Sequence, residues 1–125
     1  MSKQRVVVTG LGAISSLGNA DEFWQGLLAG RSGIRKISRF DASAMKTQVA
    51  GEVDFDPSDF DIPPKHARRM SRASLLAQAA VQMSLADSKL TVSDVQNQSE
   101  RCGVALGTAN AGFELLLETS LDYRL

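Results

Sequence analysis

Residues 5–18, which read RVVVTGLGAISSLG, decide the fold. The three consecutive valines at residues 6–8 leave no polar face, which is typical of a parallel strand buried on both sides. Gly10 and Gly12 follow, and glycine lets a backbone turn tightly and pack closely where it leaves a sheet. A helix pattern comes next. The stretch therefore predicts an α/β unit of strand, glycine-rich turn and helix.

The glycine-rich turn does not match a nucleotide-binding motif. A dinucleotide fingerprint needs G-x-G-x-x-G at the turn and an acidic residue about 20 positions further on. Ser15 stands at the third glycine position, and Gly30 and Arg31 stand where the acid should be. The phosphate-binding pattern G-x-x-x-x-G-K-[ST] is absent from the sequence as well. We therefore expect no nucleotide cofactor.

Composition narrows the class of protein. A chain of 125 residues suits one domain, and a formal net charge of zero favours neither nucleic acid nor a membrane surface as a partner. The single cysteine excludes an internal disulfide and fits a reducing compartment. The sequence opens without a basic-then-apolar leader, and no apolar run approaches ~20 residues. These features predict a cytoplasmic protein without a membrane partner.

The first half of the chain should add a helix and a short strand to the opening unit. The helix is expected to begin at Asn19 or Asp21 and to end at about Ala29, with Gly30 just past its end. A short peripheral strand is expected at residues 47–53. The buried face of the helix should comprise Trp24, Leu27 and Leu28.

The second half contains the longest predicted helix, over residues 65–87, where neither glycine nor proline interrupts the pattern. Its apolar stripe is rich in small residues, which would let the helix pack closely against another element. A second buried parallel strand is expected at residues 101–108, joined to the first strand through this helix. A last helix should run from residue 111 or 112 to about 123. Its inward side chains should be Phe113, Leu116 and Leu117.

Aspartates alternate with aromatic residues at the start of the segment 54–64. An EF-hand loop beginning at Asp54 would need glycine at its sixth position and glutamate at its twelfth. Asp59 and Lys65 occupy those two positions instead. We therefore expect a solvated surface loop anchored by its aromatic residues, and no metal site.

Basic side chains cluster at the start of the longest predicted helix, where the helix dipole favours acids. Two interpretations follow: a solvated face partly neutralised by the preceding aspartates, or an anion-binding patch. Nucleic acid is the less favoured anion because the patch is short and has no interleaved aromatic residues. The residues are Lys65, His66, Arg68, Arg69 and Arg72.

The opening VVVTGLG, followed by serine and Leu-Gly, resembles the start of the β-ketoacyl-acyl-carrier-protein synthases. These are the condensing enzymes of fatty-acid and polyketide synthesis. The resemblance spans nearly the whole chain in the family's order and is greatest for the free-standing elongating type, synthase II. The further matching segments are WQGLLAGRSG at 24–33, FDAS at 40–43, AGEV at 50–53, Arg69-Met70, and residues 103–112.

The resemblance implies a fold class and a place within it. Family members are several times longer and are built from two similar halves in the α/β thiolase-like fold, stacked as α-β-α-β-α layers. The chain is then expected to be an incomplete N-terminal half. Residues 1–125 would form one part of the synthase N-terminal domain, without an internal boundary.

The resemblance also implies the family's reaction, a decarboxylative Claisen condensation of an acyl thioester with malonyl-carrier protein. Partners would be acyl carrier protein, malonyl and acyl thioesters, and a second copy of the chain in a homodimer. The chemistry needs a thiolate in a Thr-Ala-Cys-Ser-like run and two histidines. Cys102 lies at the start of a predicted strand and is interpreted as structural, and His66 is the only histidine. We therefore assign no catalytic residue, and expect this chain to be inactive alone.

Six residues take roles from the resemblance. Asn110 stands where the family often places a bulky apolar residue that gates the acyl pocket next to the dimer partner. A polar amide there implies either a different pocket or a simple helix cap. Thr108 and Phe113 are neighbouring pocket candidates. The positions that match the family's basic docking site for the carrier protein are Lys65, Arg68 and Arg69.

Two alternatives stay open on the sequence. A non-catalytic carrier-binding protein, such as a chain-length-factor-like partner, would share the opening and lack a working cysteine. A thiolase relative would use coenzyme A thioesters instead, but the synthase-like FDAS and AGEV segments argue against it.

Overall fold

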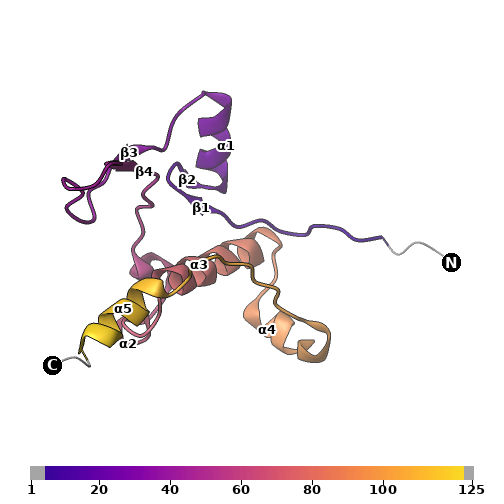
Figure 1. Ribbon diagram of the computed structural model, residues 1–125. Coiled ribbons are helices and arrows are strands. Elements are labelled where there is room, and N and C mark those ends of the chain that lie inside the picture. Colours follow the sequence, from indigo (N-terminus) through magenta and orange to yellow (C-terminus); the bar gives the residue numbers. More distant parts are fainter. Residues whose placement is uncertain (1–4, 123–125) are drawn as a thin grey trace. The chain divides into compact units, whose positions relative to one another are not determined.

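The structure is a computed structural model that describes residues 5–122, apart from the side chains of Glu118 and Asp122. Its elements fall into two compact units, Ala13–Asp56 and the remaining described residues, 5–12 with 57–122 (Figure 1). The first unit contains β1 (Ile14–Ser15), β2 (Gly18–Asn19), α1 (Ala20–Leu28), β3 (Arg35–Lys36) and β4 (Val49–Ala50). The second contains η1 (Pro57–Phe60), α2 (Pro64–Ala67), α3 (Arg72–Asp87), α4 (Val92–Gln96), η2 (Ser99–Arg101) and α5 (Phe113–Asp122).

Two antiparallel strand pairs and one capped helix make up the unit Ala13–Asp56. β1 pairs with β2, and β3 pairs with β4, so the predicted strand at 47–53 is present in a shorter form. Asn19 caps α1 by accepting hydrogen bonds from the N–H groups of Asp21 and Glu22, at 3.0 and 3.1 Å. The Glu22 carboxylate accepts the Asn19 N–H in return, at 2.9 Å, which completes a capping box. The predicted first helix is confirmed.

The buried face of α1 differs from the prediction. Trp24, Leu27 and Leu28 are all exposed, whereas Gly26 is buried. The helix packs through this glycine: a Cβ added to Gly26 would lie 3.0 Å from a methyl group of Leu17. The helix therefore makes its close contact on the glycine side. Among the described residues, no element covers its apolar side, and this explains the difference.

The predicted long helix is interrupted between α2 and α3. The Ser71 backbone is extended, with φ −64° and ψ 154°, and its side chain accepts the N–H of Ser74 at 3.2 Å. Ser71 therefore acts as the N-cap of a new helix. Serine offers the backbone a hydrogen bond outside the helix, and this local alternative overrides the continuous helical pattern.

Residues 10–12 lie against α3, and residues 5–12 form no strand. The N–H of Leu11 donates to the Asp87 carboxylate at 2.8 Å, and the Ser84 hydroxyl donates to the Gly10 carbonyl oxygen at 3.3 Å. A Cβ on Gly12 would come closer to the Ala80 carbonyl oxygen than side chains are found to approach. The glycines at positions 10 and 12 thus pack closely against the small residues of α3, as the sequence predicts.

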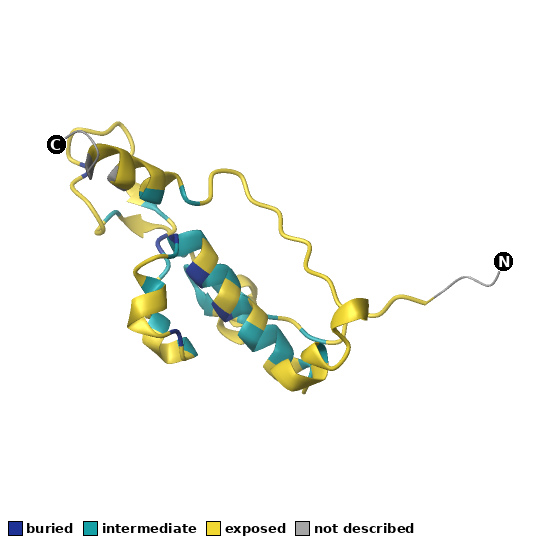
Figure 2. Ribbon diagram, turned by 90° about the horizontal axis from the view of Figure 1, so that it is seen from below, coloured by how far each residue is buried: buried dark blue, intermediate teal, exposed yellow. Residues whose placement is uncertain are grey.

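The two predicted buried strands are wrong for this structure. Val6 is 93% exposed and Val104 is 90% exposed, and neither surrounding segment is paired with another strand among the described residues. Figure 2 shows that the buried positions of this unit lie largely on and beside α3. A strand needs neighbours for its backbone N–H and C=O groups, and an apolar run alone does not supply them. No helix in the described part of the chain has the length and apolar character needed to cross a membrane.

Candidate functional site

The predicted docking residues lie on α2 and on the turn that follows it. Pro64 opens α2 at a position where a missing N–H costs little. Beyond the helix, the N–H of Arg68 donates to the Pro64 carbonyl at 3.1 Å and that of Arg69 to His66 at 2.9 Å. Helical backbone bonding thus continues past Ala67. Lys65, Arg68 and Arg69, spaced i, i+3 and i+4, share one side of this turn.

The three docking candidates are exposed cations. Within residues 5–122, Lys65, Arg68 and Arg69 make no ion pair. The preceding aspartates therefore do not neutralise them by direct pairing. Both interpretations of the basic cluster, a solvated face and an anion-binding patch, are compatible with this exposure.

The three pocket candidates lie where the chain enters α5. Thr108, Asn110 and Phe113 are exposed, so the described residues do not enclose them. The N–H of Phe113 donates to the Asn110 carbonyl oxygen at 3.4 Å, and Gly112 has a φ of +83°, so this segment makes a tight turn into the helix. The predicted inward side chains are exposed instead, because no described element covers them: Phe113, Leu116 and Leu117.

The structure brings this turn against the docking region. Glu114 Oε1 accepts a hydrogen bond from the N–H of Arg72 at 3.1 Å. A Cβ on Gly112 would lie 3.7 Å from the Ser71 side chain. In Figure 1, α2 and α5 accordingly lie at the same end of α3, and α4 lies at the other. Ser71 and Arg72, which follow the docking candidates, thus contact Gly112 and Glu114, which flank the pocket candidate Phe113.

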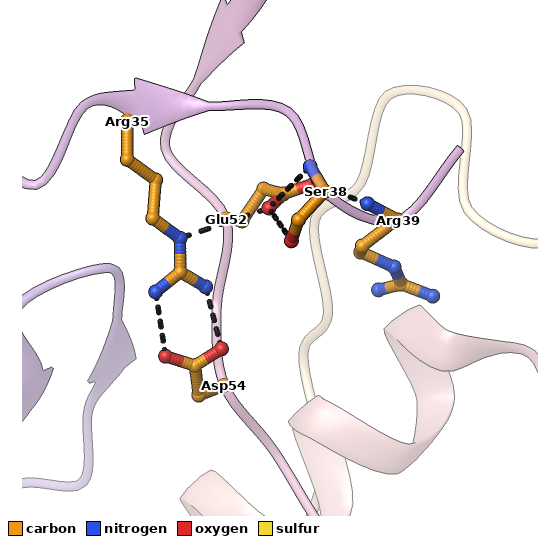
Figure 3. A network of polar contacts seen from close by, with 5 residues as sticks. All are labelled: Arg35, Ser38, Arg39, Glu52 and Asp54. Atoms are coloured by element: carbon orange, nitrogen blue, oxygen red, sulfur yellow. Dashed lines mark hydrogen bonds and ion pairs between the residues drawn. The ribbon is translucent and has the colours of Figure 1, made fainter. Parts of the chain in front are cut away.

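Sequence reasoning missed a polar network around Glu52 (Figure 3). Glu52 is only 8% exposed, and its carboxylate accepts the N–H groups of Ser38 and Arg39 at 3.1 Å and the Ser38 hydroxyl at 2.7 Å. The Arg35 guanidinium lies 3.6 Å from Glu52 and binds both oxygens of Asp54. The network holds the segment after β3 to the segment after β4. Glu52 is the one charged residue of the AGEV segment. A charged side chain within an otherwise apolar strand pattern was the signal in the sequence that could have indicated this network.

Hydrogen bonding controls the charge of this network. The Ser38 hydroxyl lowers the pKa of Glu52, and the backbone N–H groups of Ser38 and Arg39 and the Arg35 charge act in the same direction. The hydrogen bond to Asp54 raises the pKa of Arg35. Both groups therefore stay charged at neutral pH.

Cys102 is an exposed cysteine with a free thiol. It follows η2, and its N–H donates to the Ser99 carbonyl oxygen at 3.3 Å. Among the described residues, no three His, Cys, Asp or Glu side chains gather in a way that could hold a metal ion.

Comparison with known proteins decides the family. Residues 3–123 match the family described as "Beta-ketoacyl synthase, N-terminal domain". The chain belongs to the β-ketoacyl synthase family. The resemblance predicted from the opening VVVTGLG and the segments that follow it is confirmed.

Relatives of this β-ketoacyl synthase chain come from fatty-acid and polyketide systems. The 3-oxoacyl-[acyl-carrier-protein] synthase 2 of Synechocystis sp. is 43% identical over 118 residues, which are 93% of this chain and 28% of that protein. The tetracenomycin polyketide synthase ketoacyl synthase alpha subunit of Streptomyces glaucescens is 42% identical over 110 residues, 86% of this chain and 25% of that protein. The chain thus spans about a quarter of the length of these curated relatives.

A solved relative confirms the fold class. The structure titled "The ishigamide ketosynthase/chain length factor" matches 74% of this β-ketoacyl synthase chain and 23% of its own chain, with a TM-score of 0.65 and 42% identity. The fold is therefore the thiolase-like α/β fold. The described residues form a partial piece of it that mixes helices and short strands.

Proposed function

We propose that this chain is the N-terminal segment of a 3-oxoacyl-[acyl-carrier-protein] synthase and carries part of its docking surface for acyl carrier protein. The family match and the synthase 2 relatives support the reaction class. The observation that carries the docking role is the exposed turn with Lys65, Arg68 and Arg69, which lack ion-pair partners within the described residues. The complete protein would act as a cytoplasmic homodimer.

In the proposed reaction, a cysteine thiolate elsewhere in the complete protein takes the acyl group from its carrier thioester. Malonyl-carrier protein then loses carbon dioxide, and the resulting carbanion equivalent attacks the acyl-enzyme carbonyl. A carbon–carbon bond forms, the thiolate leaves, and 3-oxoacyl-carrier protein is released. Lys65 and Arg68 steer the acidic carrier by charge, and Arg69 can hold a carboxylate or phosphate with two parallel hydrogen bonds.

Changing Lys65, Arg68 and Arg69 together to glutamate in the complete protein should weaken binding of acyl carrier protein at least about tenfold at low salt. Reversed charges repel an acidic partner, and salt screens this repulsion, so the effect should shrink as ionic strength rises. Binding titrations at two salt concentrations measure it. The matched control reverses the exposed cations Lys46, Lys89 and Arg101. Unchanged affinity in the first variant, or an equal loss in the control, would contradict the proposal.

Cys102→Ser should leave the condensation rate of the complete enzyme within about twofold of the wild type. The thiol is exposed beside η2 and is assigned no part in catalysis, and surface substitutions of this kind usually have small effects. Steady-state rates with acyl- and malonyl-carrier protein measure it. A loss of a hundredfold or more with the fold retained would contradict this assignment.

A second candidate function is that of a non-catalytic partner. The solved relative's title names both a ketosynthase and a chain length factor, which favours keeping this candidate. The two functions differ in whether the protein forms a covalent acyl-enzyme. An intact-mass increase equal to the acyl group, after the complete protein is incubated with acyl-carrier protein, indicates the synthase. Carrier binding without such an adduct indicates the partner.

A further inference from the structure

Glu114 links the first turns of two helices that are far apart in sequence. Its Oε1 accepts the Arg72 N–H at 3.1 Å across a separation of 42 residues. Arg72 is the first residue of α3, where backbone N–H groups have no partner within the helix. The first turn of α3 contains no acidic residue of its own. The carboxylate from α5 therefore supplies both an acceptor and the negative charge that the N-terminal end of α3 favours.

The backbone around this bond is held by further contacts. Gly112 adopts a φ of +83°, which L side chains rarely allow, and packs beside Ser71. Ser71 is 8% exposed, and its hydroxyl lies 2.9 Å from that of Ser74 as well as capping α3. The turn into α5 therefore rests on a buried, capped helix start.

We infer that Glu114 is a positioning residue that holds the pocket candidates Asn110 and Phe113 in a fixed place relative to the docking residues Arg68 and Arg69. The inference rests on the proposed function. An acyl chain tethered to a docked carrier enters a pocket from a fixed starting point. The distance and direction from the docking surface to the pocket then limit which acyl chain lengths fit with the thioester at the reacting position. Glu114 fixes this distance and direction from within this chain.

A backbone substitution tests the bond with little change elsewhere. Arg72→Pro removes the N–H donor, and proline is favoured at the first position of a helix. The preceding Ser71 already has the extended backbone that a following proline requires. Arg72→Ala loses the same side chain but keeps the N–H, so it is the matched control. Glu114→Ala removes the acceptor, Glu114→Gln keeps a neutral one, and Glu100→Ala changes an exposed glutamate on η2.

The readout is the ratio of kcat/KM for a long and a short acyl-carrier protein in the complete enzyme. We expect Arg72→Pro and Glu114→Ala to shift this ratio at least about fivefold in the same direction. Arg72→Ala and Glu100→Ala should stay within about twofold, and Glu114→Gln should fall between. In a Glu114→Ala background, proline and alanine at position 72 should give the same ratio.

Equal ratios for Arg72→Pro and Arg72→Ala in the wild-type background would overturn the inference, as would a further effect of proline in the Glu114→Ala background. Thermal unfolding of each variant shows whether it is folded, and the Arg72 pair carries the test if Glu114→Ala is not. Failure of the docking proposal is separate. It would appear as unchanged carrier affinity after charge reversal at Lys65, Arg68 and Arg69, whatever the selectivity ratios show.

Discussion

Gly12→Ala should lower the free energy of unfolding of the complete protein by about 3 kcal/mol or more. A Cβ at this position would overlap the Ala80 carbonyl oxygen and would lie 2.8 Å from the Ser84 nitrogen. Both atoms belong to the backbone of α3, so neither can rotate aside as a flexible side chain could. Residues 10–12 would have to move off the helix, and the Leu11 N–H would lose its bond to Asp87.

Urea denaturation of the complete protein measures the loss, and hydrogen exchange at Leu11 shows whether the segment has moved. Gly107→Ala is the matched control because a Cβ there would meet nothing within 4 Å. It should change the stability by no more than about 0.5 kcal/mol. Equal stabilities for the two variants would show that the close approach at Gly12 is not required.

Glu52→Ala should expose the segment after β3. The substitution removes the acceptor of the N–H groups of Ser38 and Arg39 and of the Ser38 hydroxyl, and a donor left without an acceptor away from water is costly. We expect hydrogen-exchange protection at Ser38 and Arg39 to fall at least about tenfold, since bonds to a charged acceptor are among the stronger ones. Asp59→Ala, at an exposed carboxylate, should leave this protection unchanged. Full protection in Glu52→Ala would refute the assigned role.

The same carboxylate gives stability a predictable pH dependence. Because the Ser38 hydroxyl and the other partners lower the pKa of Glu52 in the folded protein, its contribution is fully present above the unfolded pKa of about 4.3. That contribution is lost as the pH falls through the folded pKa. Glu52→Gln cannot titrate. Its stability difference from the wild type should therefore be constant between about pH 5.5 and 7 and should shrink below about pH 4. A difference that stays constant down to pH 3 would contradict the assignment.

Local interactions explain which elements could be predicted from the sequence. The capping box of α1 joins Asn19 to Glu22, three residues away, so the sequence itself contains both partners. The interruption at Ser71 is also local, but the residues around it include neither glycine nor proline and fit a continuous helix equally well. A serine pattern alone does not say whether the side chain caps a new helix or faces solvent.

Predicting the strands and the candidate site required contacts between residues that are far apart in the sequence. The valines at residues 6–8 have strand propensity, but strand formation depends on a neighbour at the right distance and register. The docking residues were predicted from their match to a family pattern. The contact of Glu114 with Arg72 was not predicted, because it arises only when α5 meets the start of α3 across 42 residues. Glu52 was missed for the same reason, since its partners lie 13 and 14 residues away.

The bond between Leu11 and Asp87 spans 76 residues, and it has a consequence for synthesis on the ribosome. A nascent chain emerges from its N-terminus, so the glycine segment appears long before the helix on which it packs. The unit Ala13–Asp56 contains all the partners of the Glu52 network described above and can close while translation continues. Gly10, Leu11 and Gly12 therefore lack their partners on α3 throughout this interval, and this stretch is one to which a ribosome-associated chaperone could bind.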